Sequence, residues 1–228
     1  MVVAIDGPVG AGKSTVAKQV AKKLKLAYVD SGAMYRTVAW KWLKLRKQKF
    51  MPTSFSEHDL KLLARFARTT KMRFDKHGNY FVDDEKTGDV IRTPEVSQAA
   101  SLVAEVGKVR EILVRKQKNM GKETSLVMDG RDIGTVVFPR TPHKFFLTAS
   151  VEERARRRHK ELEEKEMFVP FHAVKEHLVR RDTQDKNRKV SPLRVAENAH
   201  LVNSDGKNIA QVVKEITDAV KKPKRGKK

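Results

Sequence analysis

Near the N-terminus the sequence reads Gly7-Pro8-Val9-Gly10-Ala11-Gly12-Lys13-Ser14. It fits the pattern G-x-x-x-x-G-K-[ST] at every fixed position. The apolar residues 2–5 precede it, as a strand buried on both faces would. After it, Val16, Val20 and Leu24 recur every four residues, which predicts a helix. A strand, a glycine-rich loop and a helix in this order predict a P-loop, a turn that binds phosphate at the start of a helix.

The residue types in this loop suit a nucleoside triphosphate. Glycines let backbone N–H groups approach phosphate oxygens with no Cβ in the way, and the helix N-terminus adds partial positive charge. Lys13 is expected to reach the β- and γ-phosphates, and the Ser14 hydroxyl is expected to ligate Mg²⁺. Asp129 follows the apolar residues 126–128. We expect it to support Mg²⁺ through water, the alternative being a carboxylate that caps the following turn.

Short apolar runs alternate with amphipathic stretches along the rest of the chain, which predicts a parallel α/β sheet with helices on both faces. Strands are expected at 27–29, 125–128, 144–147 and 200–202, and helices at 33–45, 60–67, 94 onward, 151–166, 171–187 and 209–220. Ser31 and Thr93 are the expected N-caps of two of these helices, and Gly107 is expected to interrupt the helix that Thr93 begins. Residues 71–75, 80–84 and 89–92, separated by turn residues, predict a small antiparallel insert at 69–93.

Composition excludes several classes of protein. The 228 residues include 49 Lys and Arg, 28 Asp and Glu and no Cys, for a net charge of +21. The lack of Cys excludes disulfides, thiol catalysis and Cys-bound zinc. No apolar run reaches the roughly 18–20 residues that span a bilayer, and the N-terminus lacks the basic segment of a signal peptide. We therefore expect a soluble cytoplasmic protein with one domain over residues 1–220.

Positive charge is concentrated at two places. Residues 221–228 carry six basic residues and no acid, and a second basic run lies between Asp30 and Glu57, where no acid occurs. The plain interpretation is a disordered tail and a solvated helix face. The alternative is nonspecific contact of the tail with polyanions such as RNA.

A P-loop by itself does not name a reaction. The N-K-x-D motif of GTPases is absent, and Asp129 is followed by Gly130 rather than by the Glu of many motor ATPases. The short chain, the insert and the arginine-rich late helices favour a kinase with a small phosphorylated acceptor, because transfer between two phosphates requires converging cations. Arg181, Asp185 and Arg188 have the spacing of one helix face, either as part of a site or as a surface salt-bridge ladder.

Several segments resemble those of the bacterial-type cytidylate kinases, within the nucleoside monophosphate kinases. They are Asp6-Gly7-Pro8 with the P-loop, Asp30-Ser31-Gly32-Ala33-Met34-Tyr35-Arg36, Arg92-Thr93-Pro94-Glu95-Val96-Ser97, Asp129-Gly130-Arg131-Asp132 through Pro139, Leu147 through Ala155, and Arg181-Asp182 with Asp185 and Arg188. The likeness runs from Met1 to about Val220. The Asp-Gly-Arg-Asp and Asp-Ser-Gly-Ala-Met-Tyr-Arg segments together are very specific to this family.

The resemblance implies a P-loop nucleoside-monophosphate-kinase fold with a five-stranded parallel sheet, an NMP-binding insert at about 69–93 and a helical lid at about 151–188. It implies a monomer that transfers phosphate from ATP, with Mg²⁺, to CMP or dCMP. The donor site would comprise residues 7–15, Thr15 included, with Arg157 from the lid. The resemblance assigns the acceptor phosphate to Arg36, Arg131 and Arg188, the cytosine edge to Ser101, Arg110 and Asp132, the ribose to Arg181 and Asp185, and the pocket wall to Ser31 and Tyr35. Lys13, Arg131 and Arg188 would be catalytic.

Two alternatives remain open. One is a P-loop kinase for a different small acceptor, such as UMP, AMP or shikimate. The other is a basic P-loop ATPase that binds nucleic acid, whose activity would be stimulated by polynucleotide and would depend steeply on salt.

Overall fold

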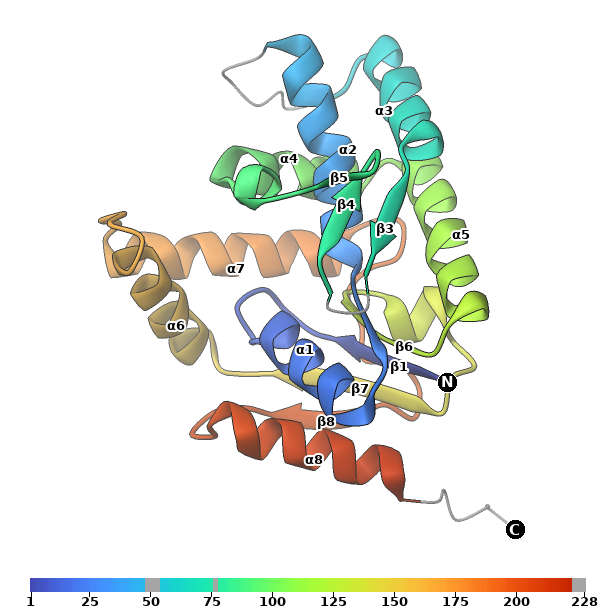
Figure 1. Cartoon of the computed structure of the whole chain (residues 1–228). Helices are drawn as coiled ribbons and strands as arrows, with labels where there is room; N and C mark the ends of the chain where they lie inside the picture. The colour runs from blue at the N-terminus through green and yellow to red at the C-terminus, as the bar shows by residue number, and fades with distance from the viewer. Residues whose placement is uncertain (48–53, 76–77, 223–228) are drawn as a thin grey trace. The chain divides into compact units, whose positions relative to one another are not determined.

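The computed structural model describes residues 1–47, 54–75 and 78–222. They form two compact units: the first comprises Met1 and residues 27–126, and the second comprises residues 2–26 and the chain from residue 127 onward (Figure 1). A five-stranded parallel sheet has the strand order β2-β6-β1-β7-β8. A separate three-stranded antiparallel sheet has the order β3-β4-β5. The predicted α/β fold with a small antiparallel insert is therefore confirmed.

The parallel strands are the apolar runs that the sequence marks. They are β1 (Val2–Asp6), β2 (Ala27–Asp30), β6 (Leu126–Gly130), β7 (His143–Thr148) and β8 (His200–Asn203). In the second unit, Ile5 of β1 lies opposite Phe145 of β7, and Leu147 of β7 lies opposite Val202 of β8. Ile5, Leu147 and Val202 are fully buried. Burial on both faces explains why β1, β2 and β6 appear as continuous apolar runs. Burial alternates along β7, and three of the four residues of β8 are exposed.

The helices of the second unit are α1 (Lys13–Leu24), α6 (Val151–Glu163), α7 (Phe171–Asn187) and α8 (Ile209–Lys221), with a π-helical turn at Ile133–Val137. Helix α1 packs beside α8, and α6 packs against α7 (Figure 1). The apolar stripe of α8 is buried, as its spacing predicts. Lys221 belongs to α8, so the predicted disordered tail begins at least one residue too early. Residues 223–228 lie outside the described residues.

The first unit contains α2 (Ser31–Arg46), α3 (Glu57–Thr69), α4 (Pro94–Val103) and α5 (Gly107–Glu123), together with β3 (Met72–Phe74), β4 (Tyr80–Val82), β5 (Glu85–Lys86) and the 3-10 turn Asp89–Arg92. Helix α2 packs on α3 and α4, and α3 packs on α5. Met34, Trp42, Leu63 and Leu113 fill the core between these helices. Among the described residues, no helix is long and apolar enough to cross a bilayer.

The third strand of the insert differs from the prediction. Residues 89–92 form a 3-10 turn, and the third strand is Glu85–Lys86. Val82 pairs directly with Glu85, so the two-residue turn of Asp83 (φ 50°) and Asp84 (φ 71°) joins β4 to β5. Two left-handed residues are typical of a tight hairpin turn, which Asn-Gly or Asp-Gly usually forms. An Asp-Asp pair lacks that glycine, which is why the sequence pattern missed the turn.

Helix capping follows the sequence with one correction. Helix α2 begins at Ser31, and Asp30 rather than Ser31 caps it, because the Asp30 carboxylate accepts the Ala33 N–H at 2.9 Å. Thr93 caps α4 as predicted. Helix α4 ends at Val103 and α5 starts at Gly107, so the predicted interruption is confirmed.

Candidate active site

The P-loop joins β1 to α1, and its geometry requires glycine at several positions. A Cβ on Gly7 would lie 2.0 Å from the carbonyl oxygen of Leu147, a distance no side chain can occupy. Gly10 (φ 76°) and Gly12 (φ 84°) are left-handed, a conformation that glycine adopts without steric cost. Gly12 directly precedes the first residue of α1, so the N-terminus of that helix opens onto the loop. The result is a backbone cradle of the kind that holds phosphate groups.

Lys13 is buried in this cradle, where its Nζ donates to the Pro8 carbonyl oxygen at 2.6 Å. Burial and the nearby Arg131 guanidinium together lower the pKa of Lys13 to about 7, and three carboxylates of the second unit oppose this shift. A phosphate anion beside Nζ would favour the charged form. The position and the electrostatics of Lys13 therefore suit an anionic ligand.

The two residues predicted to support a metal ion lie together. The Ser14 hydroxyl donates to Oδ2 of Asp129 at 2.7 Å, although 115 residues separate them. Asp129 lies on β6 and is almost fully buried. A hydroxyl and a carboxylate are oxygen ligands of the kind that Mg²⁺ prefers. The donor set at this position therefore fits Mg²⁺ bound together with phosphate oxygens.

Asp185 of α7 holds two of the predicted phosphate-binding arginines. Its side chain is fully buried; Arg131 Nε donates to Oδ2 at 2.7 Å, and Arg188 donates to Oδ1. Burial raises the pKa of Asp185, but the ion pairs with Arg131 and Arg188 outweigh burial and leave this pKa below its ordinary value. Arg181, one turn earlier on α7, lowers it further. A buried carboxylate with two oriented guanidinium groups is not a surface salt-bridge ladder.

One arginine of α6 makes contacts that the sequence did not reveal. Arg154 is 3% exposed and donates to the carbonyl oxygen of Val9 in the P-loop at 3.0 Å. It also donates to the Ala149 carbonyl oxygen and forms an ion pair of 2.7 Å with Asp182. Arg154 thus ties the P-loop to α6 and α7. Helical spacing alone could not distinguish Arg154 from the solvated arginines of the same helix. The charge pattern of α6 does not indicate which face of the helix packs against the P-loop.

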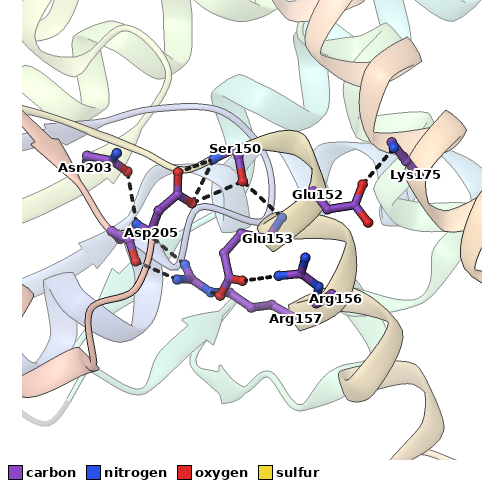
Figure 2. Close-up of polar contacts among 9 residues, drawn as sticks. Ser150, Glu152, Glu153, Arg156, Arg157, Lys175, Asn203 and Asp205 are labelled. Atoms are coloured by element: carbon purple, nitrogen blue, oxygen red, sulfur yellow. Dashed lines mark hydrogen bonds and ion pairs between the residues drawn. The ribbon is translucent and has the colours of Figure 1, made fainter.

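Arg157, the lid residue predicted to contact the donor, lies beside the P-loop. Figure 2 shows its guanidinium between Glu153 and the segment at 203–205. It donates to Glu153 at 2.9 Å and to the Ser204 carbonyl oxygen at 2.8 Å. A Cβ on Gly12 would lie 3.8 Å from an Arg157 nitrogen. Arg157 is therefore held in a fixed orientation next to the phosphate cradle.

Asp132 directly precedes a turn that is hydrogen-bonded to the last residue of β1. It is 5% exposed and directly precedes the π-helical turn Ile133–Val137. The carboxylate of Asp6, the last residue of β1, accepts the Ile133 N–H at 2.8 Å and the Gly134 N–H at 2.7 Å. Burial raises the pKa of Asp6 to about 7, against the effect of these two hydrogen bonds. Asp6 is a residue that site prediction from the sequence did not include.

In the first unit, Asp30 orients Arg36 at the start of α2. Its carboxylate accepts from Arg36 at 2.7 Å and from Arg92 at 3.1 Å. Burial raises the pKa of Asp30, but the two arginines outweigh burial and keep it below its ordinary value. Ser31 and Tyr35, the predicted pocket residues, are also buried in this part of α2.

The two helix residues assigned to the cytosine edge are buried, not surface residues. Ser101 on α4 and Arg110 on α5 are each 3% exposed. Ser101 Oγ donates to the Ser97 carbonyl oxygen at 3.2 Å, and Arg110 donates to the Ala104 carbonyl oxygen at 2.9 Å. The Arg110 guanidinium lies over the Tyr35 ring, 5.3 Å from its centroid. Both side chains are therefore buried and hydrogen-bonded to backbone carbonyl oxygens rather than solvated on a helix face.

The fold and the site together define a class of protein. The P-loop lies at the β1–α1 junction of a parallel sheet, Ser14 lies beside Asp129, and oriented arginines belong to the same unit. These are the features of a P-loop protein that binds nucleotide phosphates. The profile of the cytidylate kinase family matches residues 3–222. The chain therefore belongs to the cytidylate kinase family.

Curated relatives agree with this family assignment, and a solved structure resembles the fold. The chain is 43% identical to the cytidylate kinase of Caldanaerobacter subterraneus subsp. tengcongensis, covering 98% of this chain and 96% of the relative. It is 47% identical to that of Desulforamulus reducens (97% of each chain) and 42% identical to that of Clostridioides difficile (96% and 98%). The crystal structure of an uncharacterized protein from Eubacterium ventriosum covers 96% of this chain and 97% of its own, with a TM-score of 0.52 and 12% identity. That structural likeness concerns the fold alone.

Proposed function

We propose that this protein transfers the γ-phosphoryl group of ATP to CMP or dCMP, giving CDP or dCDP and ADP. The observation that carries the proposal is the match to the cytidylate kinase family over residues 3–222, which includes the phosphate cradle and every predicted acceptor residue. We further propose a cytoplasmic monomer in which the insert at 69–93 serves the acceptor and the helices within 151–188 form a lid.

On the donor side, the backbone N–H groups of the P-loop hold the β- and γ-phosphates of ATP, and Lys13 stabilises the charge that develops on the oxygen between them. The Ser14 hydroxyl would ligate Mg²⁺, and Asp129, whose Oδ2 lies 2.7 Å from the Ser14 hydroxyl, would support the ion through water. When bound, Mg²⁺ neutralises charge on the phosphates. No side chain needs to act as a general base, because the attacking oxygen of the acceptor phosphate is already an anion.

On the acceptor side, Arg36 of the first unit and Arg131 and Arg188 of the second bind the phosphate of the nucleoside monophosphate. Arginine suits this role because its planar fork matches two phosphate oxygens at once. Asp185 orients two of these forks before the substrate arrives, which reduces the cost of assembling the site. A carboxylate has about four lone-pair positions, so Asp185 can still accept from ribose hydroxyls beside Arg181.

The cytosine base is recognised by Ser101, Arg110 and Asp132. Cytosine offers an amino group as donor and N3 and O2 as acceptors, so a carboxylate and two donors are complementary to it.

A panel of acceptors tests the proposed function. Purified protein is incubated with ATP, Mg²⁺ and either CMP, dCMP, UMP, AMP or shikimate, and ADP formation is followed in a coupled assay. We expect CMP and dCMP to give the highest kcat/KM. Faster turnover of AMP, UMP or shikimate would contradict the proposal. ATP hydrolysis that needs a polynucleotide would favour the nucleic-acid-binding alternative.

Replacement of Asp132 by Ala tests the recognition of the base. If Asp132 accepts a hydrogen bond from the cytosine amino group, Asp132→Ala should weaken the binding of CMP by about 1–3 kcal/mol. UMP presents a carbonyl oxygen where CMP presents that amino group, so the binding of UMP should weaken much less. The expected result is a lower CMP:UMP ratio of kcat/KM, measured in the same coupled assay.

Two further variants serve as controls for this experiment. Asp132→Asn retains an acceptor oxygen and should preserve more of the ratio than Ala does. Arg131→Ala should depress CMP and UMP alike, because a phosphate contact carries no information on the base. Equal losses of kcat/KM for CMP and UMP in Asp132→Ala would show that Asp132 does not recognise the base. Base recognition would then rest on Ser101 and Arg110.

Removal of residues 222–228 tests the basic tail. The deletion removes five positive charges and keeps Lys221, the last residue of α8. Stability and CMP turnover should barely change, whereas nonspecific binding to single-stranded RNA should weaken with a shallower salt dependence. A large loss of CMP turnover would show that the tail takes part in catalysis, contrary to the proposal.

A further inference from the structure

Asp6 stands between the phosphate cradle and the segment that carries Arg131 and Asp132. It is the last residue of β1, immediately before Gly7, and it is 3% exposed. Each of its two carboxylate oxygens accepts one backbone N–H, that of Ile133 at 2.8 Å and that of Gly134 at 2.7 Å. These are the two residues that directly follow Asp132. One side chain therefore links the donor loop to the acceptor segment through two hydrogen bonds.

The two N–H groups that Asp6 accepts open a π-helical turn. The first N–H groups of a helical segment have no partner inside the helix and need an acceptor from elsewhere. A carboxylate satisfies two of them at once and adds a favourable negative charge at that end of the turn. The position of the turn, and with it the backbone of Asp132, therefore depends on where the Asp6 carboxylate lies.

Packing leaves this contact little freedom. A Cβ on Gly134 would lie 3.3 Å from Oδ2 of Asp6, 3.2 Å from Cβ of Ala196 and 3.4 Å from Cδ of Lys144. The turn thus lies close against the carboxylate, and an added methyl group would require its neighbours to move by a few tenths of an ångström. Two charged groups on other elements act on Asp6: Asp132, which precedes the turn, and Lys13 on α1.

We propose that Asp6 is a positioning residue for acceptor recognition: it holds the Arg131-Asp132 segment at the distance from the P-loop that places Asp132 against the base. This inference rests on the proposed role of Asp132. The hydrogen bonds of Asp6 go to backbone N–H groups of the turn. Asp6 acts by fixing the backbone from which Asp132 extends, and a shift of that backbone changes base recognition more than ATP binding.

The test is Asp6→Asn, which has nearly the same shape. The amide oxygen can accept one N–H, but the amide NH₂ then faces the other N–H, so one hydrogen bond is lost and a donor is left unpaired. We expect the CMP:UMP ratio of kcat/KM to fall about tenfold through a higher KM for CMP, while the KM for ATP changes less than about twofold. Amide hydrogen exchange at Ile133 and Gly134 should become faster.

A matched control separates positioning from a general loss of stability. Asp59 in the first unit is also a buried carboxylate, with hydrogen bonds from Trp42, Arg46 and Ser56. Asp59→Asn should lower stability and leave the CMP:UMP ratio unchanged. Gly134→Ala perturbs the same contact from the side of the turn and is used if Asp6→Asn does not fold. It should also lower the CMP:UMP ratio of kcat/KM.

The outcomes are distinct. An unchanged CMP:UMP ratio in folded Asp6→Asn, or in Gly134→Ala where Asp6→Asn does not fold, would overturn the inference and leave Asp6 a structural residue. If the wild type prefers CMP and Asp132→Ala lowers the ratio while Asp6→Asn does not, only the inference fails. If the wild type does not phosphorylate CMP, the proposed function itself fails.

Discussion

Lys13→Ala is expected to lower kcat at least about 100-fold with the fold intact, the scale of losing one preorganised group that stabilises transition-state charge. The Lys13 Nζ lies inside the P-loop, donating to Pro8, and its pKa of about 7 reflects burial rather than solvent contact. A triphosphate would add negative charge beside this buried ammonium group, where burial and Arg131 outweigh the effect of three nearby carboxylates. Alanine removes the cation and nothing else of the cradle, since the backbone N–H groups remain.

The measurement is kcat for ATP and CMP in the coupled assay, with thermal unfolding followed by circular dichroism. Lys22→Ala is the matched control, because Lys22 is an exposed lysine of the same helix and its loss changes the net charge equally. We expect Lys22→Ala to retain wild-type kcat. Near-normal turnover in Lys13→Ala would show that the P-loop lysine takes no part in the reaction.

Asp185→Ala is expected to lower the free energy of unfolding by about 3–5 kcal/mol, because removal of one partner leaves buried charges uncompensated. Asp185 is fully buried and accepts from both Arg131 and Arg188, and the Arg188 side chain is only 5% exposed. The same substitution removes the carboxylate that orients Arg131 and Arg188, the two arginines that should bind the acceptor phosphate. The kcat/KM for CMP and for UMP should therefore fall together.

Urea unfolding measures the stability change. Asp218→Ala serves as the control, since Asp218 forms an exposed ion pair with Lys214 one turn away on α8 and should contribute little. Adding Arg188→Ala to Asp185→Ala should recover part of the lost stability, because one of the unpaired charges is then gone. A stability loss no larger than that of Asp218→Ala would contradict the role assigned to the buried carboxylate.

Local sequence predicted most of the secondary structure because the relevant interactions are local. The P-loop needs glycine at positions whose backbone is left-handed or closely approached, and those glycines stand at fixed spacing in the sequence. Strands buried on both faces appear as apolar runs, and helix α8 shows its buried stripe directly. The insert was located but its third strand was misplaced, because Asp83-Asp84 forms a turn that usually contains glycine.

By itself, the sequence determined the phosphate cradle, the α/β class and the resemblance that pointed to a family of kinases. Only the tertiary structure decided which charged groups meet: Asp6 with Ile133, Val9 with Arg154, and Arg131 with Asp185, pairs separated by 127, 145 and 54 residues. No sequence pattern connects such pairs, since their contact depends on strand order and on which helix faces pack. Periodicity shows which face of a helix is apolar, whereas the partner of a buried charge is set by whatever the fold brings within hydrogen-bonding distance of it.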